Sequence, residues 1–150
     1  MDKRKVIYDC DPGHDDAIAL LIGLASEKLD IVAITTSAGN QTQDRTYTNV
    51  KGLLSLVKRE DIPVGRGAEK PLKRNLIIAD YIHGKTGIDG AELPLPTVED
   101  RKLKALDLMV EILRKSDEKV TIVATGPQTN VAILLMAYPE LKEKIEAIVF

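Results

Sequence analysis

Hydrophobic residues follow two alternating patterns along this chain. Short runs of aliphatic and β-branched residues, such as residues 30–37, are typical of strands buried on both faces of a sheet. Longer segments, in which apolar residues recur every three or four positions, are typical of helices that bury one face. The pattern predicts strands over residues 5–10, 30–37, 62–65, 119–124 and 145–150, and helices over residues 15–27, 42–59, 98–116 and 127–137.

Alternating strands and helices predict an α/β fold with a mostly parallel sheet and flanking helices. Ligands of such sheets bind beyond the carboxyl ends of the strands. Three polar segments follow predicted strands, namely residues 9–16, Asn40 and Thr125, and we expect them to converge at one edge of the sheet. Residues 66–96 have few periodic apolar positions and predict a long loop, a feature that is often functional.

Composition narrows the class of protein. The chain has 150 residues, 44% of them hydrophobic and only 3% aromatic, which suits one domain with an aliphatic core. The net charge is −2 and no basic block is present, so nucleic-acid binding gains no support. No secretory signal or membrane-length apolar run is visible, and we expect a cytoplasmic protein without a membrane partner. The single cysteine, Cys10, excludes an intrachain disulfide framework.

Four carboxylates lie within eight residues where the first strand meets the first helix. Asp9 and Asp11 point to the same side of the strand, because side chains alternate. Asp15 and Asp16 fall in the first helical turn, where helix capping and the helix dipole explain one or both of them. Capping does not explain the two acids at the strand end. Clustered carboxylates repel unless a cation lies among them, and their oxygens suit calcium or magnesium. The cluster therefore predicts a metal or polar-ligand site.

The segment Asp9-Cys10-Asp11-Pro12-Gly13-His14-Asp15-Asp16-Ala17 resembles the N-terminal signature of the nucleoside hydrolases. These are calcium-dependent N-ribohydrolases of the inosine/uridine-preferring type. Three further segments resemble that family in the same order, which makes the resemblance specific: residues 38–40, 82–90 and 125–130. The resemblance implies a Rossmann-like core, homodimers or homotetramers, and hydrolysis of ribonucleosides to ribose and free base. Residues 78–83 look most like pyrimidine-preferring or mixed members, and the choice between purine and pyrimidine stays open.

The resemblance also implies roles for individual residues. Asp11 matches the residue that is both calcium ligand and general base, and Asp16 matches a bidentate calcium ligand. Thr125 matches the position whose backbone carbonyl binds the metal. Asp15 and Asn40 match positions that contact the ribose.

Four further residues have less defined roles. Asp9 matches a family acid that supports the site. His83 is expected near the nucleobase, as a contact or a gate, although a loop histidine without a task is the alternative. His14 is interpreted as structural or peripheral, and Asp89 as a turn residue.

Members of the family are about twice as long as this chain, in line with the usual size of one-domain α/β enzymes. Residues 146–150 are an apolar run that reads as a strand, so residues 1–150 are expected to be the N-terminal part of a single nucleoside hydrolase domain, with doubtful activity alone. One alternative is an inactive truncated or split half-domain. Another is a magnesium-dependent phosphatase of the haloacid-dehalogenase-like class, which also places Asp-x-Asp after its first strand. Pro12, Gly13 and His14 depart from that class, which favours Gly and then Thr or Val.

Overall fold

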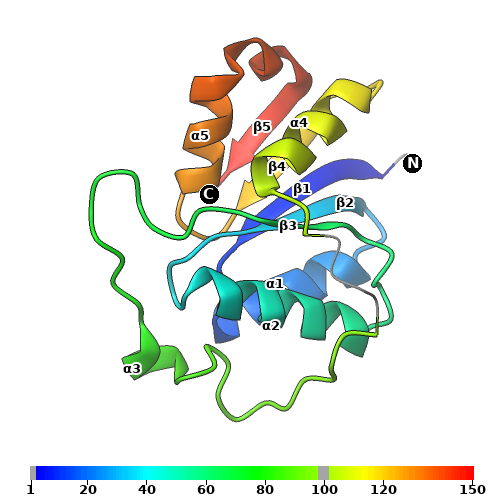
Figure 1. Ribbon diagram of the computed structural model, residues 1–150. Coiled ribbons are helices and arrows are strands. Elements are labelled where there is room, and N and C mark those ends of the chain that lie inside the picture. The colour runs from blue at the N-terminus through cyan, green and yellow to red at the C-terminus, as the bar shows by residue number, and fades with distance from the viewer. Residues whose placement is uncertain (1–2, 98–101) are drawn as a thin grey trace.

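Five parallel strands form the centre of the computed structural model, which describes residues 3–97 and 102–150 (Figure 1). Their order across the sheet is β3-β2-β1-β4-β5, and every neighbouring pair is parallel. The strands are β1 (Arg4–Cys10), β2 (Leu29–Thr36), β3 (Val64–Arg66), β4 (Val120–Ala124) and β5 (Ile145–Val149). The predicted α/β fold with a parallel sheet is confirmed.

Helices cover both faces of this sheet. Figure 1 shows α1 (His14–Ala25) and α2 (Gln43–Leu56) on one face, and α4 (Ala105–Lys115) and α5 (Thr129–Ala137) on the other. A 3-10 helix, η1 (Pro139–Lys144), leads into β5. The one-turn helix α3 (Asp80–His83) stands away from both layers, on the long connection that follows β3.

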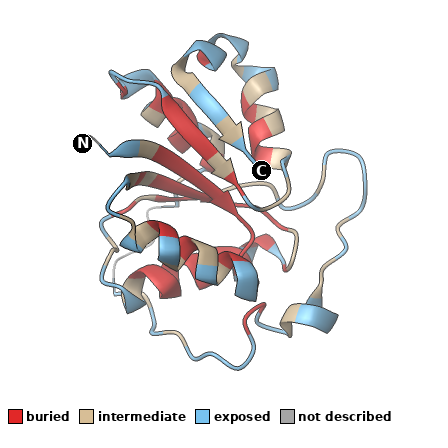
Figure 2. Cartoon of the chain, turned by 180° about the vertical axis from the view of Figure 1, so that it is seen from behind, coloured by how far each residue is buried: buried red, intermediate tan, exposed pale blue. Residues whose placement is uncertain are grey.

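Two separate hydrophobic clusters hold these layers together. Val6 and Tyr8 of β1 pack in the cluster that includes α1 and α2, whereas Ile7 packs with α4 and α5. This division follows from the alternation of side chains along a strand. Figure 2 shows the central strands buried over most of their length, while β5 at the sheet edge is largely intermediate or exposed.

Some local predictions were wrong. The helix predicted over residues 98–116 begins at Ala105; residues 98–101 lie outside the described residues, and residues 102–104 are not helical. Instead, Leu103 O accepts a hydrogen bond from Arg66 N (2.8 Å), so this segment runs beside β3. Pro127 precedes the N-cap of α5 and is not in its first turn. β3 is shifted from the predicted residues 62–65, and the predicted loop contains α3.

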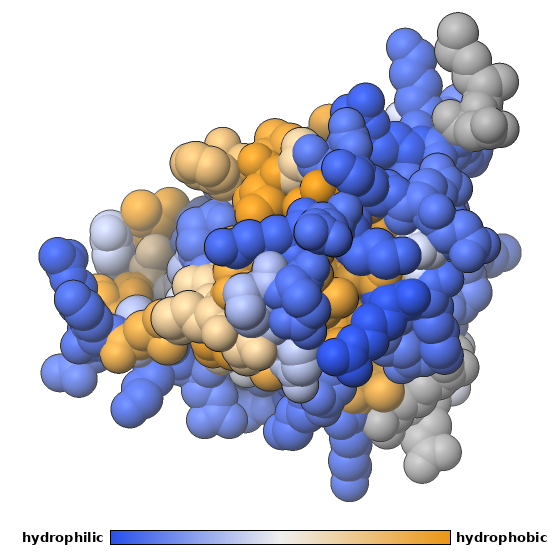
Figure 3. All heavy atoms as spheres, turned by 90° about the horizontal axis from the view of Figure 1, so that it is seen from above, coloured by the Kyte–Doolittle hydropathy of each residue, from blue (hydrophilic) through white to orange (hydrophobic). Residues whose placement is uncertain are grey.

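Polar side chains predominate on the face shown in Figure 3. Figure 3 looks onto the side of the molecule that carries α4 and α5, where apolar side chains gather between broad polar areas. Exposed apolar side chains in this half of the fold include Met136 of α5 and Val149 and Phe150 at the end of β5. Within the described ranges, no helix is both long enough and apolar enough to cross a membrane.

Candidate functional site

Residues 9–16, named here the acid turn, connect β1 to α1 at the carboxyl edge of the sheet. Asp9, Asp11 and Asp16 are 0%, 5% and 4% exposed, whereas His14 and Asp15 are exposed. Asp11 N donates a hydrogen bond to Asp16 Oδ2 (2.9 Å), so the turn folds back on itself. Two buried carboxylates therefore face the same short stretch of backbone.

The carboxylate of Asp11 is enclosed by the segments that follow β2 and β4, the two strands on either side of β1. Asn40 N donates to Asp11 Oδ2 (2.6 Å), and Asn40 Nδ2 donates to Asp11 O (3.1 Å). A side chain at Gly39 would overlap Asp11 Oδ2, and a Cβ at Gly126 would lie 2.9 Å from Asp11 Oδ1. The two glycines thus leave the space in which the carboxylate sits.

Burial shapes the electrostatics of the acid turn. Desolvation is the largest cause that raises the pKa of Asp11, to about 7; the Asn40 amide opposes it and the charge of Asp16 adds to it. Desolvation also raises the pKa of Asp9, to about 6, against hydrogen bonds from Asn130 and Thr35. The ion pairs within residues 3–97 and 102–150 include none of the aspartates of the acid turn.

These carboxylates fit a hard cation, but they do not complete its coordination shell. A divalent cation would stabilise the charged forms that burial disfavours. In the described part of the chain, however, no group of three or more His, Cys, Asp or Glu side chains is placed to hold a metal ion. Calcium takes six to eight oxygens. Backbone carbonyls, water and groups other than these side chains would have to supply the rest.

Asn130, which the sequence leaves open as a polar residue of the helix face or as a hydrogen-bond partner beneath the site, supports the acid turn from α5. Its Nδ2 donates to Asp9 Oδ1 (2.8 Å) and to Thr36 O (3.0 Å), and its Oδ1 accepts from Ala68 N (2.8 Å). Thr35 Oγ1 also donates to Asp9 Oδ1 (2.5 Å), while Asp9 Oδ2 is buried without a hydrogen bond. Asn130 therefore ties β1, β2 and the segment after β3 together. The only sequence signal was its place in residues 125–130, a segment that carries the family resemblance.

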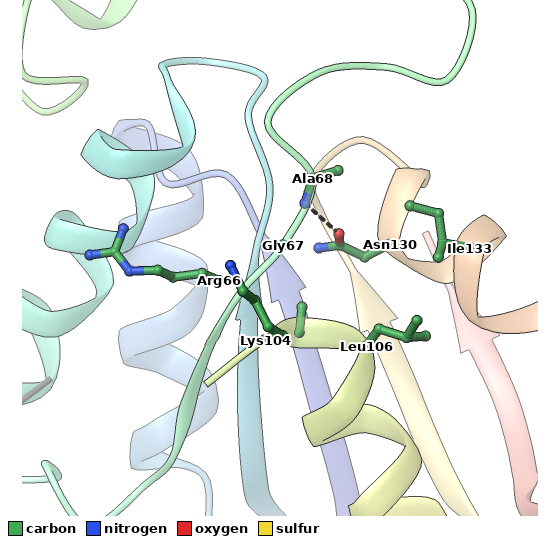
Figure 4. Close-up of a pocket in the computed structure, with 8 residues that line it drawn as sticks. Arg66, Gly67, Ala68, Lys104, Leu106, Asn130 and Ile133 are labelled. Carbon is green, nitrogen blue, oxygen red and sulfur yellow. Dashed lines mark hydrogen bonds between the residues drawn. The ribbon is translucent and has the colours of Figure 1, made fainter. Parts of the chain in front are cut away.

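A cavity of about 230 Å³ lies beside Asn130, between the end of β3, the start of α4 and α5 (Figure 4). Figure 4 shows the Arg66 side chain directed away from this cavity. Arg66 Nη1 bonds Asp44 Oδ1 (2.7 Å), and its guanidinium lies 3.8 Å from the centre of the Tyr47 ring. The charge of Arg66 thus pairs with Asp44 and the Tyr47 ring and does not face the cavity. The lining is Arg66, Gly67, Ala68, Lys104, Ala105, Leu106, Asn130 and Ile133.

Residues 67–97, named here the α3 loop, dock on the start of α2 and on the acid turn. Ala79 N donates to Asn40 O (2.9 Å), and Gln41 Nε2 donates to Gly84 O (3.1 Å). Asn49 Nδ2 donates to both Thr86 O (2.9 Å) and Pro12 O (3.2 Å). These backbone and side-chain contacts dock the loop so that His83, the last residue of α3, reaches the N-terminus of α1.

His83 meets His14 at this junction. His14 N donates to His83 Nδ1 (3.3 Å), the two Nδ1 atoms are 3.3 Å apart, and His14 Nε2 lies 2.9 Å from Asp89 O. The carboxylate of Asp89 accepts from the backbone N–H groups of Lys85 and Thr86 and from Thr86 Oγ1, and these bonds lower its pKa. Asp89 is a turn residue, as predicted.

The structure brings some predicted site residues together and leaves others apart. Asp11, Asp16 and Asn40 are in direct contact. Thr125 follows β4, and its backbone N–H bonds Asp9 O (2.9 Å) while its side chain is exposed. Asp15 is exposed in the first turn of α1, and His83 lies on the α3 loop. The predicted roles of these residues remain predictions.

Comparison with known proteins gives a consistent result. The family model described as inosine-uridine preferring nucleoside hydrolase matches residues 6–150. The chain is 60% identical over 144 residues to the pyrimidine-specific ribonucleoside hydrolase RihA of Enterobacter sp. (strain 638), and 58% identical to RihA of Escherichia coli O1:K1 / APEC. In both cases the match covers 96% of this chain and 46% of the relative. The chain thus spans about half the length of these curated relatives.

Solved structures agree. A plant nucleoside hydrolase, the PpNRh1 enzyme, superposes with a TM-score of 0.90 at 36% identity, over 98% of this chain and 47% of that one. An inosine-guanosine nucleoside hydrolase gives 0.88 at 32% identity, over 96% and 46%.

Proposed function

This chain belongs to the inosine-uridine preferring nucleoside hydrolase family, and on that premise we propose that the protein hydrolyses the N-glycosidic bond of ribonucleosides to ribose and free base. The observation that carries the proposal is the buried carboxylate of Asp11, which accepts a hydrogen bond from Asn40 N, while the backbone N–H of Asp11 donates to the carboxylate of Asp16. Pyrimidine ribonucleosides are the proposed substrates, because relatives 58–60% identical carry the name pyrimidine-specific. The phosphatase alternative gains no support from the family match.

Asp11 is the proposed general base. Burial raises its pKa to about 7 without a cation, and a bound cation would favour the charged carboxylate that can take a proton from an attacking water. The family is generally metal-dependent, and calcium is the proposed ion, held by Asp11, Asp16 and the carbonyl of Thr125. When bound, such an ion acts as a Lewis acid and lowers the pKa of a bound water.

Asn40 and Asp15 are the proposed ribose contacts. The two N–H donors of Asn40 that bond Asp11 leave Asn40 Oδ1 without a hydrogen bond among the described residues. This oxygen can accept a bond from a sugar hydroxyl. The exposed carboxylate of Asp15 offers a second acceptor. His83 is the proposed contact of the nucleobase. The homo-oligomer and the cytoplasmic location stay predictions.

The test is release of free base by the complete native polypeptide. Uridine and cytidine should be hydrolysed faster than inosine, the reaction should stop in a chelator, and it should return with calcium. Nucleoside monophosphates should react poorly, because the chain has no Gly-rich phosphate-binding loop. Hydrolysis of monophosphates at the rate of nucleosides, or no hydrolysis of any ribonucleoside, would contradict the proposal. Residues 1–150 alone are expected to show little activity, because two carboxylates and one carbonyl are few ligands for calcium.

A further inference from the structure

Helix α1 begins without a cap from its own turn. The N-cap residue, Gly13, has no side chain, and the first backbone N–H groups of a helix lack partners within it. The first of them, His14 N–H, donates to Nδ1 of His83 across 69 residues of sequence. The His83 ring can approach because Gly13 has no Cβ: that atom would lie 2.6 Å from His83 Nδ1. A residue of the α3 loop therefore caps α1.

Two contacts at 3.3 Å compete to decide which nitrogen of His83 carries a proton. A backbone amide can only donate, so His83 Nδ1 accepts from His14 N, and a neutral imidazole that accepts at Nδ1 has its proton on Nε2. The His14 ring opposes this when its Nε2 donates to Asp89 O, because its own Nδ1 is then an acceptor that favours a proton on His83 Nδ1. We propose that the first amide of α1 sets His83 as a hydrogen-bond donor through Nε2, and that His14 is thereby a positioning residue for base recognition. The recognition part rests on the proposed function.

The donor is available for a ligand. The Cγ–Nδ1–Cε1 edge of the His83 ring faces Gly13, so Nε2 lies on the far side of the ring. Within the described residues, no hydrogen bond uses His83 Nε2. A ring held as a donor recognises acceptors, such as a carbonyl oxygen or an unprotonated ring nitrogen of a nucleobase. It disfavours an exocyclic amino group at the same place, because two donors would then face each other.

Apart from the contact of His14 Nε2 with Asp89 O, the α3 loop is anchored by residues other than His14. Gln41 binds Gly84 O, Asn49 binds Thr86 O, and Asn40 O accepts from Ala79 N. Substitution of His14 should therefore leave the loop docked while it changes the ring contact. Two substitutions distinguish the effect of the His14 backbone amide from the effect of the His14 side chain.

His14→Pro removes the amide donor, and His14→Ala keeps it. Proline is well suited to the first position of a helix, and the extended ψ of Gly13 (−164°) permits a following proline. Residues 1–150 contain two histidines, so within this segment each variant leaves only His83. Ring 15N chemical shifts at alkaline pH, where imidazole is neutral, report directly which nitrogen is protonated.

We expect His83 to carry its proton on Nε2 in the unsubstituted chain and in His14→Ala, and to interconvert between both tautomers in His14→Pro. A proton on Nδ1 of His83 in the unsubstituted chain would overturn the proposal, even if His14→Pro failed to fold. The proposal would also be overturned if His83 had the same tautomer in both variants, or if His14→Ala lost the tautomer with the proton on Nε2.

The ring measurement needs no substrate, so its outcome is independent of the proposed function. In the complete native polypeptide, kcat/KM for uridine should be about three- to tenfold lower in His14→Pro than in His14→Ala, the scale of one lost hydrogen bond. Equal values would overturn the recognition part. If no variant and no unsubstituted protein hydrolyses nucleosides, the proposed function fails while the tautomer result stands.

Discussion

In the acid turn, Asp11 and Asp16 are 5% and 4% exposed, whereas in the α3 loop Tyr81 and Ile82 are 81% and 62% exposed. The carboxylate of Asp11 accepts a backbone amide at 2.6 Å and lies between segments that follow two strands. The α3 loop is held largely by single side-chain amides that reach its carbonyls, from residues such as Asn49.

The two regions therefore have different freedom to move. The acid turn can shift only if the ends of β1, β2 and β4 shift with it, because its contacts are made by these strand ends. The α3 loop has few buried apolar contacts, and such segments open locally without global unfolding. We infer that the proposed chemistry belongs to the rigid region and base recognition to the adjustable one.

The largest effect should follow from substitution within the acid turn. Asp11→Asn keeps the shape of the side chain but removes the base, so turnover by the complete native polypeptide should fall by about 10²-fold or more. The measurement is kcat for uridine. Asp117→Asn, an exposed acid before β4, is the matched control and should keep the activity of the unsubstituted protein. Turnover by Asp11→Asn within a few-fold of that activity would contradict the assignment.

A second substitution removes the hydrogen bond that Asn130 of α5 donates to Asp9 of the acid turn. Asn130→Ala leaves Asp9 Oδ1, Thr36 O and Ala68 N with fewer partners in a buried region. Each unsatisfied buried group costs about 1–3 kcal/mol, so the free energy of unfolding should fall by about 2–4 kcal/mol. Urea denaturation measures this change, with the neighbouring Thr129→Ala as control. An equal loss of unfolding free energy in Asn130→Ala and Thr129→Ala would mean that the hydrogen bonds of Asn130 do not stabilise the fold.

A third prediction uses pH. Burial raises the pKa of Asp9 to about 6 and of Asp11 to about 7, from an ordinary 3.8. The folded state thus binds these protons more tightly than the unfolded chain does. The two protonated carboxyl groups therefore contribute fully to the free energy of unfolding below pH 3.8, and this contribution is lost as pH rises through 7. With a chelator present, the free energy of unfolding should decline over this range, and less so in Asp11→Asn. Identical pH profiles for the unsubstituted protein and Asp11→Asn would argue against a raised pKa of Asp11.

The smallest effect is expected in the α3 loop. Asp89→Ala removes three hydrogen bonds that organise residues 85–89, all on the surface. Amide hydrogen exchange should speed up in that loop, while the urea midpoint stays close to that of the unsubstituted chain. A large shift of the midpoint would mean that the loop is part of the cooperative core, and the contrast between the two regions would be lost.

The acid turn could be predicted because its parts are adjacent in sequence. A strand end, a Pro-Gly turn and a helix start follow one another within residues 9–16, so the order of the elements alone brings the carboxylates to one edge of the sheet. Helix capping does not explain Asp15 or Asp16, because α1 has no side-chain cap hydrogen bond. The role of Asn130 could not be predicted, because its contacts with Asp9 and Ala68 span 121 and 62 residues. The contact of His14 with His83 joins residues that are 69 positions apart, and it could not be predicted for the same reason.

Errors in the fold have similar causes. Leu103 fits the apolar pattern of a helix, but its carbonyl pairs with Arg66 N, so the chain stays extended until Ala105. The helix α3 is a single turn in which Ala79 O accepts from the amides of Ile82 and His83. One turn has too few residues to show a periodic pattern.

The central proposal, that the acid turn binds calcium, is tested most directly by isothermal titration of calcium into the purified complete native polypeptide. We predict that the unsubstituted protein binds calcium and that Asp11→Ala and Asp16→Ala each lose most of that binding. Binding by both variants with the affinity of the unsubstituted protein would contradict the account and would place the metal elsewhere.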